Sequence, residues 1–189
     1  MTAAALAFTT SRPDPALGVC AGRVLLMAGL VFGAANLVQW GIIGGAIDLH
    51  PAFLALNWAL AVSAFLVGSL RLRRIGGPVG CRVAGWSRAF ILSHVALALA
   101  LAATSYLAGD WSLMRWHAVG GLALYAAAWA IAALRTGTPN MGALFVIALG
   151  GALASATMLG TPDQYLIQTC TLLLAAFLPG LWLAFGRRL

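Results

Sequence analysis

The side chains that could do chemistry in this sequence are mostly uncharged and sit inside apolar stretches. Three histidines, His50, His94 and His117, can exchange a proton near neutral pH or ligate a metal ion. The side chains best placed to line a path for a solute are Asn36, Asn57, His94, Tyr125, Trp129 and Gln168. Because lipid offers no hydrogen bonds to a polar side chain, each of these residues needs a partner or a function inside the protein.

The histidine spacing limits how haem or a metal could bind. At 1.5 Å per residue, we expect His94 and His117 to differ in height by roughly 20 Å, too far apart to ligate one haem within a chain. His50 and His117 are expected at the same level, so a haem or metal between those two is an alternative. The three cysteines are widely spaced and form no C-x-x-C pair, which disfavours a zinc site or a disulfide framework. We therefore predict no cofactor.

Motifs for hydrolysis and for nucleotide binding are missing from the sequence. It has no H-E-x-x-H, no G-x-S-x-G and no glycine-rich phosphate loop. It also has no Lys and no Glu, and no Asp or Arg is expected deep in an apolar stretch. Ion-coupled pumps usually keep a charged group inside the membrane. The sequence therefore argues against an enzyme and favours a protein that handles an uncharged or weakly polar solute.

The composition is that of a membrane protein. Hydrophobic residues make up 62% of the chain and charged residues only 8%, against about 25% in a soluble domain. About 20 apolar residues cross the hydrocarbon core as a helix. The qualifying stretches are 24–46, 51–70, 89–108, 116–134, 141–160 and 165–185. None alternates in polarity as barrel strands do. We predict an all-α bundle of six transmembrane helices in one domain, 24–189, preceded by an N-terminal tail, 1–23.

The arginines predict the orientation of this bundle. If the N-terminus is cytoplasmic, every arginine except Arg115 falls on the cytoplasmic side, as the positive-inside rule requires. We therefore predict a multi-pass protein of a bacterial inner membrane with both termini in the cytoplasm. The arginines serve orientation, so no nucleic-acid partner is expected. The longest predicted loop is 71–88, because its Gly-Gly-Pro sequence should break the helix, and its five arginines place it on the cytoplasmic side.

Small residues spaced four apart predict close helix packing. The glycines in such pairs or ladders are Gly29, Gly33, Gly41, Gly45, Gly150 and Gly151. Their spacing leaves open whether the contacts lie within one chain, in a homo-oligomer or in a larger membrane complex. Pro179 predicts an interruption near the end of the last helix, because proline lacks the N–H that bonds back one turn.

These observations lead to one preferred function and two alternatives. The preferred function is a channel or transporter for a small solute. The alternatives are a non-catalytic subunit or assembly factor of a larger membrane complex, and a small haem or metal protein using His50 and His117. In length and number of spans the chain resembles the six-helix acetate/succinate transporters and the urea channels. The N-P-A-P-L-G-L motif of the first group is not present, so no functional residue is carried over.

Overall fold

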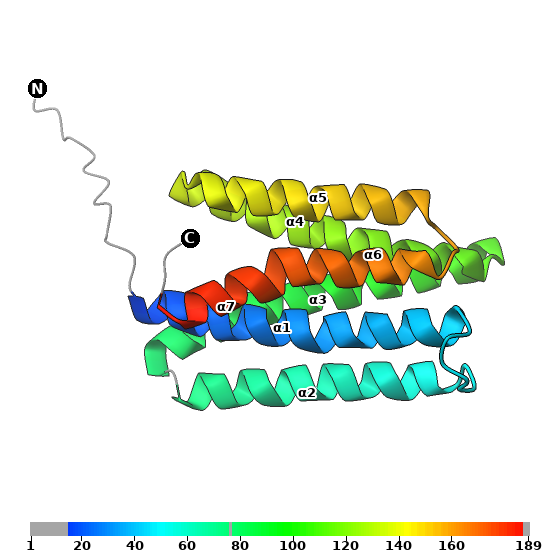
Figure 1. Ribbon diagram of the computed structural model, residues 1–189, viewed down its shortest axis with the longest axis horizontal. Helices are drawn as coiled ribbons and strands as arrows, with labels where there is room; N and C mark the ends of the chain where they lie inside the picture. Colours follow the sequence, from blue (N-terminus) through cyan, green and yellow to red (C-terminus); the bar gives the residue numbers. More distant parts are fainter. Residues whose placement is uncertain (1–14, 76, 187–189) are drawn as a thin grey trace, which may run out of the picture.

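The computed structural model describes residues 15–75 and 77–186, which fold almost entirely into helices (Figure 1). In chain order the elements are α1 (Pro15–Ile43), α2 (Phe53–Ile75), α3 (Gly77–Ala108), η1 (Trp111–Arg115), α4 (Trp116–Thr136), α5 (Pro139–Thr157), α6 (Asp163–Leu172), η2 (Leu173–Phe177) and α7 (Leu178–Ala184). The segment η1 is a 3-10 helix and η2 is a π-helix. Because α6, η2 and α7 follow one another directly, they form one interrupted helix.

Six helical segments of the described chain are long and apolar enough to cross a membrane. They are α1, α2, α3, η1 with α4, α5, and α6 with η2 and α7. Large apolar side chains face outward along them; Leu107 and Leu134, for example, are 82% and 86% exposed. Apolar surface on this scale is stable in lipid and not in water. The predicted all-α, six-helix, multi-pass membrane protein is therefore confirmed.

Helices extend further than the apolar stretches alone indicate. α1 begins at Pro15, so part of the predicted N-terminal tail is helical. The prediction of a loop over 71–88 is wrong, because α2 runs to Ile75 and α3 begins at Gly77. Gly77 adopts a φ of 54°, which favours glycine, and Pro78 occupies the first turn of α3, where its missing N–H costs nothing. The glycine and proline that were expected to end helical structure instead form a sharp reversal between two helices.

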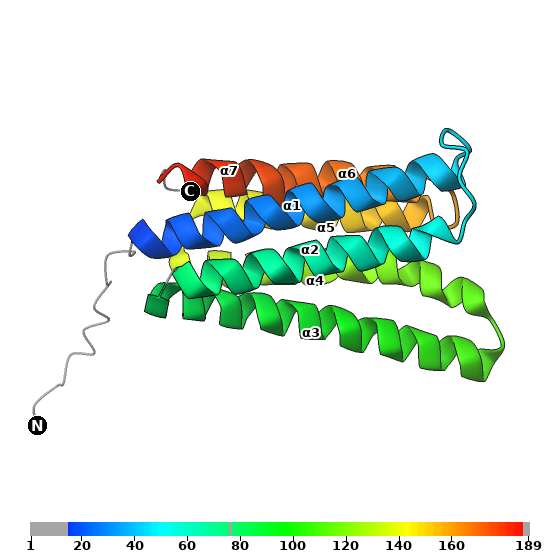
Figure 2. The same ribbon diagram turned by 90° about the horizontal axis from the view of Figure 1, so that it is seen from below.

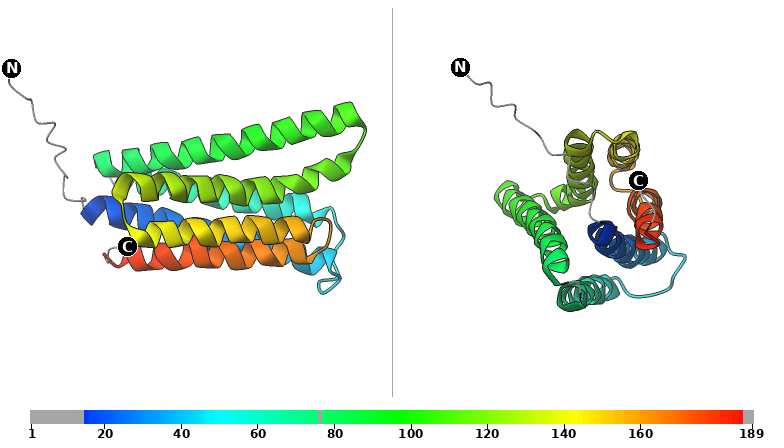
Figure 3. Two further views of the ribbon diagram at one scale, coloured as in Figure 1. Left: turned by 90° about the horizontal axis from the view of Figure 1, so that it is seen from above. Right: turned by 90° about the vertical axis from the view of Figure 1, so that its left-hand side faces the viewer.

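The first helix, α1, lies in the middle of the bundle. It contacts α2, α3, α6, η2 and α7, and the end-on view of Figure 3 shows it surrounded by them. α4 packs mainly against α5, and α5 in turn packs against α6. α3 runs along one edge of the bundle, as Figure 2 shows, and is the least buried of the spanning helices. The residues best shielded from lipid therefore lie where α1, α4, α5 and α6 face one another.

Charge distinguishes the two ends of the bundle. Asp48, Asp110 and Asp163 lie at or beside the α1–α2, α3–η1 and α5–α6 connections, at the right of Figure 1, and we call this the Asp end. The opposite end is called the Arg end, and its described arginines are Arg23, Arg71, Arg73, Arg74, Arg82, Arg88 and Arg135. Arg12, Arg187 and Arg188 lie outside the described residues. Among the described residues, Arg115 is the one arginine at the Asp end.

Glycines bring the backbone of α1 into direct contact with those of η2 and α7. A Cβ atom added to Gly29 would lie 2.5 Å from the backbone nitrogen of Phe177, and one added to Gly22 would lie 2.5 Å from that of Ala184. On the facing helix, a Cβ added to Gly180 would overlap the backbone of Leu26. Such an approach is open only to residues without a side chain, and it is how membrane helices gain packing energy.

The other glycines predicted to pack helices have different surroundings. A Cβ on Gly151 of α5 would overlap Thr171 of α6, and one on Gly41 would meet the side chain of Ile47 at 2.6 Å. Added Cβ atoms on Gly33 and Gly150 would meet nothing within 4 Å. Gly45 lies beyond the end of α1 with a φ of 75°, so it serves a turn. A role of Gly33 or Gly150 in contacts between copies stays a prediction.

The last spanning helix is interrupted where Pro179 predicts it. The proline removes one backbone donor and its ring collides with the carbonyl one turn earlier. In the structure the preceding residues, Leu173–Phe177, widen into a π-helix, and Pro179 then occupies the first turn of α7. π-helical turns inside helices are frequent at functional sites. The interruption separates the polar segment α6 from the tightly packed segment α7.

Candidate functional site

The buried face of α6 is polar, unlike that of an ordinary helix. Its buried residues are Gln164, Gln168, Thr169 and Thr171. Gln164, Gln168 and Thr171 follow the spacing i, i+4, i+7, which places them on one side of the helix. The buried face of a helix is normally apolar, because burying polar groups costs free energy unless they are paired. Each of these side chains therefore needs a hydrogen-bond partner or a function.

Gln164 ties two segments together at the Asp end. Its side chain is fully buried. The amide nitrogen donates to the backbone oxygen of Arg115 at 3.0 Å, and the amide oxygen accepts from the backbone nitrogen of Gly160 at 3.4 Å. Because Arg115 ends η1 and Gly160 belongs to the α5–α6 connection, one side chain joins α6 to both. Gln164 thus has a structural role.

Gln168, one turn further into the bundle, makes no hydrogen bond to the part of the chain that the structure describes. The threonines beside it are satisfied: Thr169 donates to the backbone oxygens of Gly33 at 3.2 Å and Tyr165 at 3.1 Å, and Thr171 donates to that of Ile167 at 2.8 Å. Gln168 is only 7% exposed. A buried polar group without a partner costs about 1–3 kcal/mol. An amide left free in this position is available to a water molecule or a solute.

Further buried polar atoms lie near the level of Gln168. The oxygens Oδ1 of Asn36 and Oγ of Ser155 are buried and have no partner among the described residues. α1 and α5 both run antiparallel to α6, with Gly33 bonded to Thr169 and Gly151 packed on Thr171. This pairing places Asn36 and Ser155 within about one helical turn of Gln168 along the bundle. Three helices therefore bring unused hydrogen-bonding capacity to one level.

A second group of predicted site residues forms a chain of ring contacts between α3 and α4. The ring centroids lie 6.2 Å apart for His94 and His117, 4.4 Å for Phe90 and His94, 5.4 Å for Phe90 and Tyr125, and 6.2 Å for Tyr125 and Trp129. The Tyr125 hydroxyl and the Trp129 indole nitrogen are buried and, apart from each other, have no partner among the described residues. Phe90, which the sequence did not indicate as a site residue, connects the histidines to Tyr125.

The prediction that His94 and His117 are far apart is wrong. The 3-10 helix η1 adds helical turns before α4, so His117 lies inward from the α3–η1 connection and meets His94. Nδ1 of His94 lies 3.0 Å from the backbone oxygen of Phe90, which makes Nδ1 the donor and leaves Nε2 for the side facing Gly121. Within the described residues no group of three potential metal ligands is present.

The remaining predicted residues lie elsewhere. Asn57 of α2 donates to the backbone oxygen of Ala35 at 2.9 Å, so it joins α2 to α1. His50 is exposed in the α1–α2 connection, and its Nδ1 accepts from the backbone nitrogen of Ala52 at 3.2 Å, just before α2. The structure therefore places Asn36 at the level of Gln168 and connects His94 through Phe90 to Tyr125 and Trp129, while Asn57 serves helix packing.

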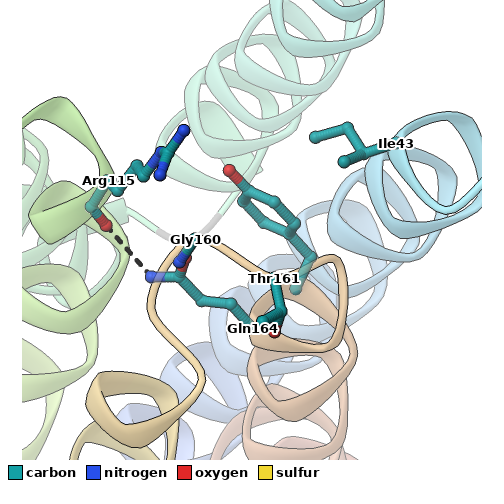
Figure 4. Close-up of a pocket in the computed structure, with 6 residues that line it drawn as sticks. Ile43, Arg115, Gly160, Thr161 and Gln164 are labelled. Atoms are coloured by element: carbon teal, nitrogen blue, oxygen red, sulfur yellow. Dashed lines mark hydrogen bonds between the residues drawn. The ribbon is translucent and has the colours of Figure 1, made fainter. Parts of the chain in front are cut away.

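A pocket that the sequence did not reveal opens at the Asp end, next to the polar face of α6. Its volume is about 130 Å³, and it is lined by Ile43, Arg115, Gly160, Thr161, Gln164 and Tyr165. Figure 4 shows Arg115 and Ile43 on opposite sides, with Gly160, Thr161 and Gln164 between them. Gly160 has a φ of 87°, and a Cβ there would lie 2.8 Å from Nη1 of Arg115. The glycine therefore permits the turn and makes room for the guanidinium.

Two of the three aspartates of the Asp end, Asp110 and Asp163, accept hydrogen bonds from groups other than the Arg115 side chain. Oδ1 of Asp110 accepts from the backbone nitrogen of Ser112 at 2.9 Å and caps η1. Hydrogen bonds from Ser112 hold the pKa of Asp110 below its ordinary value, so the cap is ionised at neutral pH. Asp163, at the start of α6, accepts from the indole nitrogen of Trp40 at 3.2 Å. Among the described residues, no carboxylate lies within 4.0 Å of the Arg115 guanidinium.

Comparison of this chain with known protein families, with curated proteins and with solved structures found no match.

Proposed function

We propose that this protein is a channel or transporter for a small solute, with a path that begins at the Asp-end pocket and follows the buried polar face of α6. The observation that carries the proposal is Gln168, a buried amide without a hydrogen bond among the described residues, one turn inward from the pocket residue Gln164. An amide in that position can bond to a passing solute in place of water. Asn36 and Ser155 supply further acceptors and donors at the same level.

The interrupted helix supports the same function. Transporters often place their binding sites where a spanning helix is broken near mid-membrane. Here the polar segment α6 ends at the π-helix η2, and beyond it α7 packs backbone to backbone on α1. A solute that reaches the end of α6 therefore meets a tightly packed barrier, which has to move for passage. The geometry favours a gated path over a permanently open pore.

The orientation of the path follows from the arginines. The positive-inside rule places the Arg end in the cytoplasm of a bacterial cell and the Asp end outside. The pocket is then the external mouth of the path. In this orientation Trp111 and Trp116, which are exposed at the Asp end, lie at the level of the outer headgroups, where indole rings are enriched.

Transport into liposomes tests this proposal. We expect purified, reconstituted protein to speed the entry of at least one small polar solute over protein-free liposomes, and the Gln168→Met variant to lose roughly five- to tenfold of that rate. One hydrogen bond to the solute, about 1 kcal/mol, accounts for a loss of this size. Thr104→Val, on an exposed face of α3, is the control and should leave the rate unchanged. If the rate of entry is the same with and without protein for every small polar solute tested, the proposal is wrong.

A further inference from the structure

We propose that the Asp-end pocket binds an oxyanion, a carboxylate or a phosphate, through the guanidinium of Arg115. The side chain is exposed and lines the pocket. A guanidinium presents five N–H donors in a planar fork that matches the oxygens of carboxylate and phosphate. None of these donors is hydrogen-bonded to the part of the chain that the structure describes. A fixed cation with free donors in a pocket is an arrangement that selects an oxyanion.

The position of Arg115 is fixed from its backbone. Its carbonyl oxygen accepts from the fully buried Gln164, so α6 holds the end of η1 in place. Gly160 leaves room beside Nη1 that any other residue would fill. The backbone of Arg115 is thereby anchored beside the pocket, so that only its side-chain torsions have to be ordered when an anion binds.

Within the described residues no carboxylate forms an ion pair with this guanidinium, although Asp110 is near enough to interact with its charge. Asp110 is committed to capping η1 through Ser112, and Asp163 to the indole of Trp40. Two hydroxyls line the pocket. That of Thr161 already donates its proton to the backbone oxygen of Met158 at 2.8 Å, whereas that of Tyr165 pairs with the Gln39 side chain, whose amide can be the donor, so the Tyr165 proton stays available. The pocket thus offers one cation and one further donor, which suits a small singly charged group.

The oxyanion can come from two sources. If the solute path begins here, as proposed above, a small free anion is the solute that the pocket concentrates. Arg115 also lies between Trp111 and Trp116 at the headgroup level of that orientation, so the phosphate of a phospholipid is within reach. Both sources share the chemistry of a guanidinium–oxyanion pair, and binding is measured without transport.

The test uses delipidated, detergent-purified protein. Isothermal titration with acetate and with inorganic phosphate measures free anions, acetamide is the neutral match for acetate, and native mass spectrometry with added short-chain phosphatidylglycerol measures the lipid. We expect Arg115→Gln to weaken binding at least about tenfold, since charge-assisted bonds are lost. Tyr165→Phe should weaken it by a smaller factor. Arg135→Gln, at the Arg end, is the matched control and should bind normally; Arg135 lies over the Trp86 ring.

The outcomes distinguish a free anion from a lipid headgroup as the ligand, and they also show whether the proposed site exists. Arg115-dependent binding of acetate or phosphate, with none of acetamide, supports a site for free anions. Arg115-dependent binding of phosphatidylglycerol alone supports a lipid headgroup site. Binding that Arg115→Gln leaves unchanged, or no binding of any of these probes, overturns the inference. Because Gln164 bonds to the backbone of residue 115, the Arg115→Gln variant keeps that contact and should fold. Binding without transport would leave this inference standing and contradict only the proposed function.

Discussion

Gly29→Ala should disrupt the contact between α1 and η2, while Gly33→Ala, one turn further along α1, should leave it intact. A Cβ on Gly29 would lie 2.5 Å from the backbone nitrogen of Phe177, so two backbones would have to separate. Overpacking of this kind costs about 1–3 kcal/mol or more. A Cβ on Gly33 meets nothing within 4 Å, and alanine is favoured over glycine in a helix by about 1 kcal/mol. We therefore predict that Gly29→Ala lowers the stability of the protein and that Gly33→Ala raises it.

Unfolding in mild detergent with increasing SDS, followed by tryptophan fluorescence, measures both variants against the wild type. A second adjacent pair gives an independent comparison. Gly151→Ala should destabilise, because its Cβ overlaps Thr171, whereas Gly150→Ala should be neutral or stabilising, because nothing lies within 4 Å. Equal effects within either pair would show that the helices do not pack as described.

Gln164→Met is the second change for which we expect a large loss of stability. The substitution keeps the size of a fully buried side chain and removes both of its hydrogen bonds, to Arg115 and to Gly160. The carbonyl oxygen of Arg115 then loses the donor that reaches it from α6. Leaving a buried partner unpaired costs about 1–3 kcal/mol, so the variant should unfold at a clearly lower SDS fraction than the wild type.

Gln168→Met is the matched control for this change, since it is the same substitution four residues later. Gln168 has no hydrogen bond to lose among the described residues, so its replacement should leave stability unchanged or raise it slightly. Under the proposed function the two glutamines divide the roles: Gln164 supports the fold and Gln168 binds the solute. A large loss of stability in Gln168→Met would show that its amide has a structural partner and would remove it from the path.

Span lengths and charge were enough to predict the fold. Long apolar stretches and arginines gathered at one end depend only on the solubility of side chains in lipid, so they can be read from the sequence. The prediction of a loop over 71–88 was wrong because Gly77 and Pro78 suit a sharp turn of the chain and the start of a new helix as well as they suit a loop. The sequence also could not show which glycines contact a neighbouring helix. Gly29 and Gly33 belong to the same four-residue spacing, and only the structure shows that an added Cβ atom would overlap another residue at Gly29 and not at Gly33.

The candidate site was predicted in part. Asn36, Gln168, Tyr125 and Trp129 were selected as polar groups in apolar stretches, and the structure buries all four. The pocket was missed because it joins residues from α1, η1, the α5–α6 connection and α6. Two signals in the sequence pointed toward it: Arg115 is the exception to the charge asymmetry, and Gln164, Gln168 and Thr171 share one helical face.

Thiol accessibility at position 168 tests most directly whether the polar face of α6 lines a water-filled path. In membranes, the rate of labelling by a charged methanethiosulfonate reagent would be compared for two proteins, each with a single thiol on α6. One carries Gln168→Cys together with Cys170→Ala, and the other keeps the native Cys170, which is exposed on the outside of the bundle at nearly the same depth. Cys20 and Cys81 are replaced by serine in both.

The two thiols should differ strongly. A thiol must ionise to react, which requires water, so we expect the thiol introduced by Gln168→Cys to react at least about tenfold faster than Cys170. An excess of a solute that the protein transports should slow that reaction. If position 168 proves as unreactive as Cys170, water does not reach the polar face of α6, and the proposed path is contradicted.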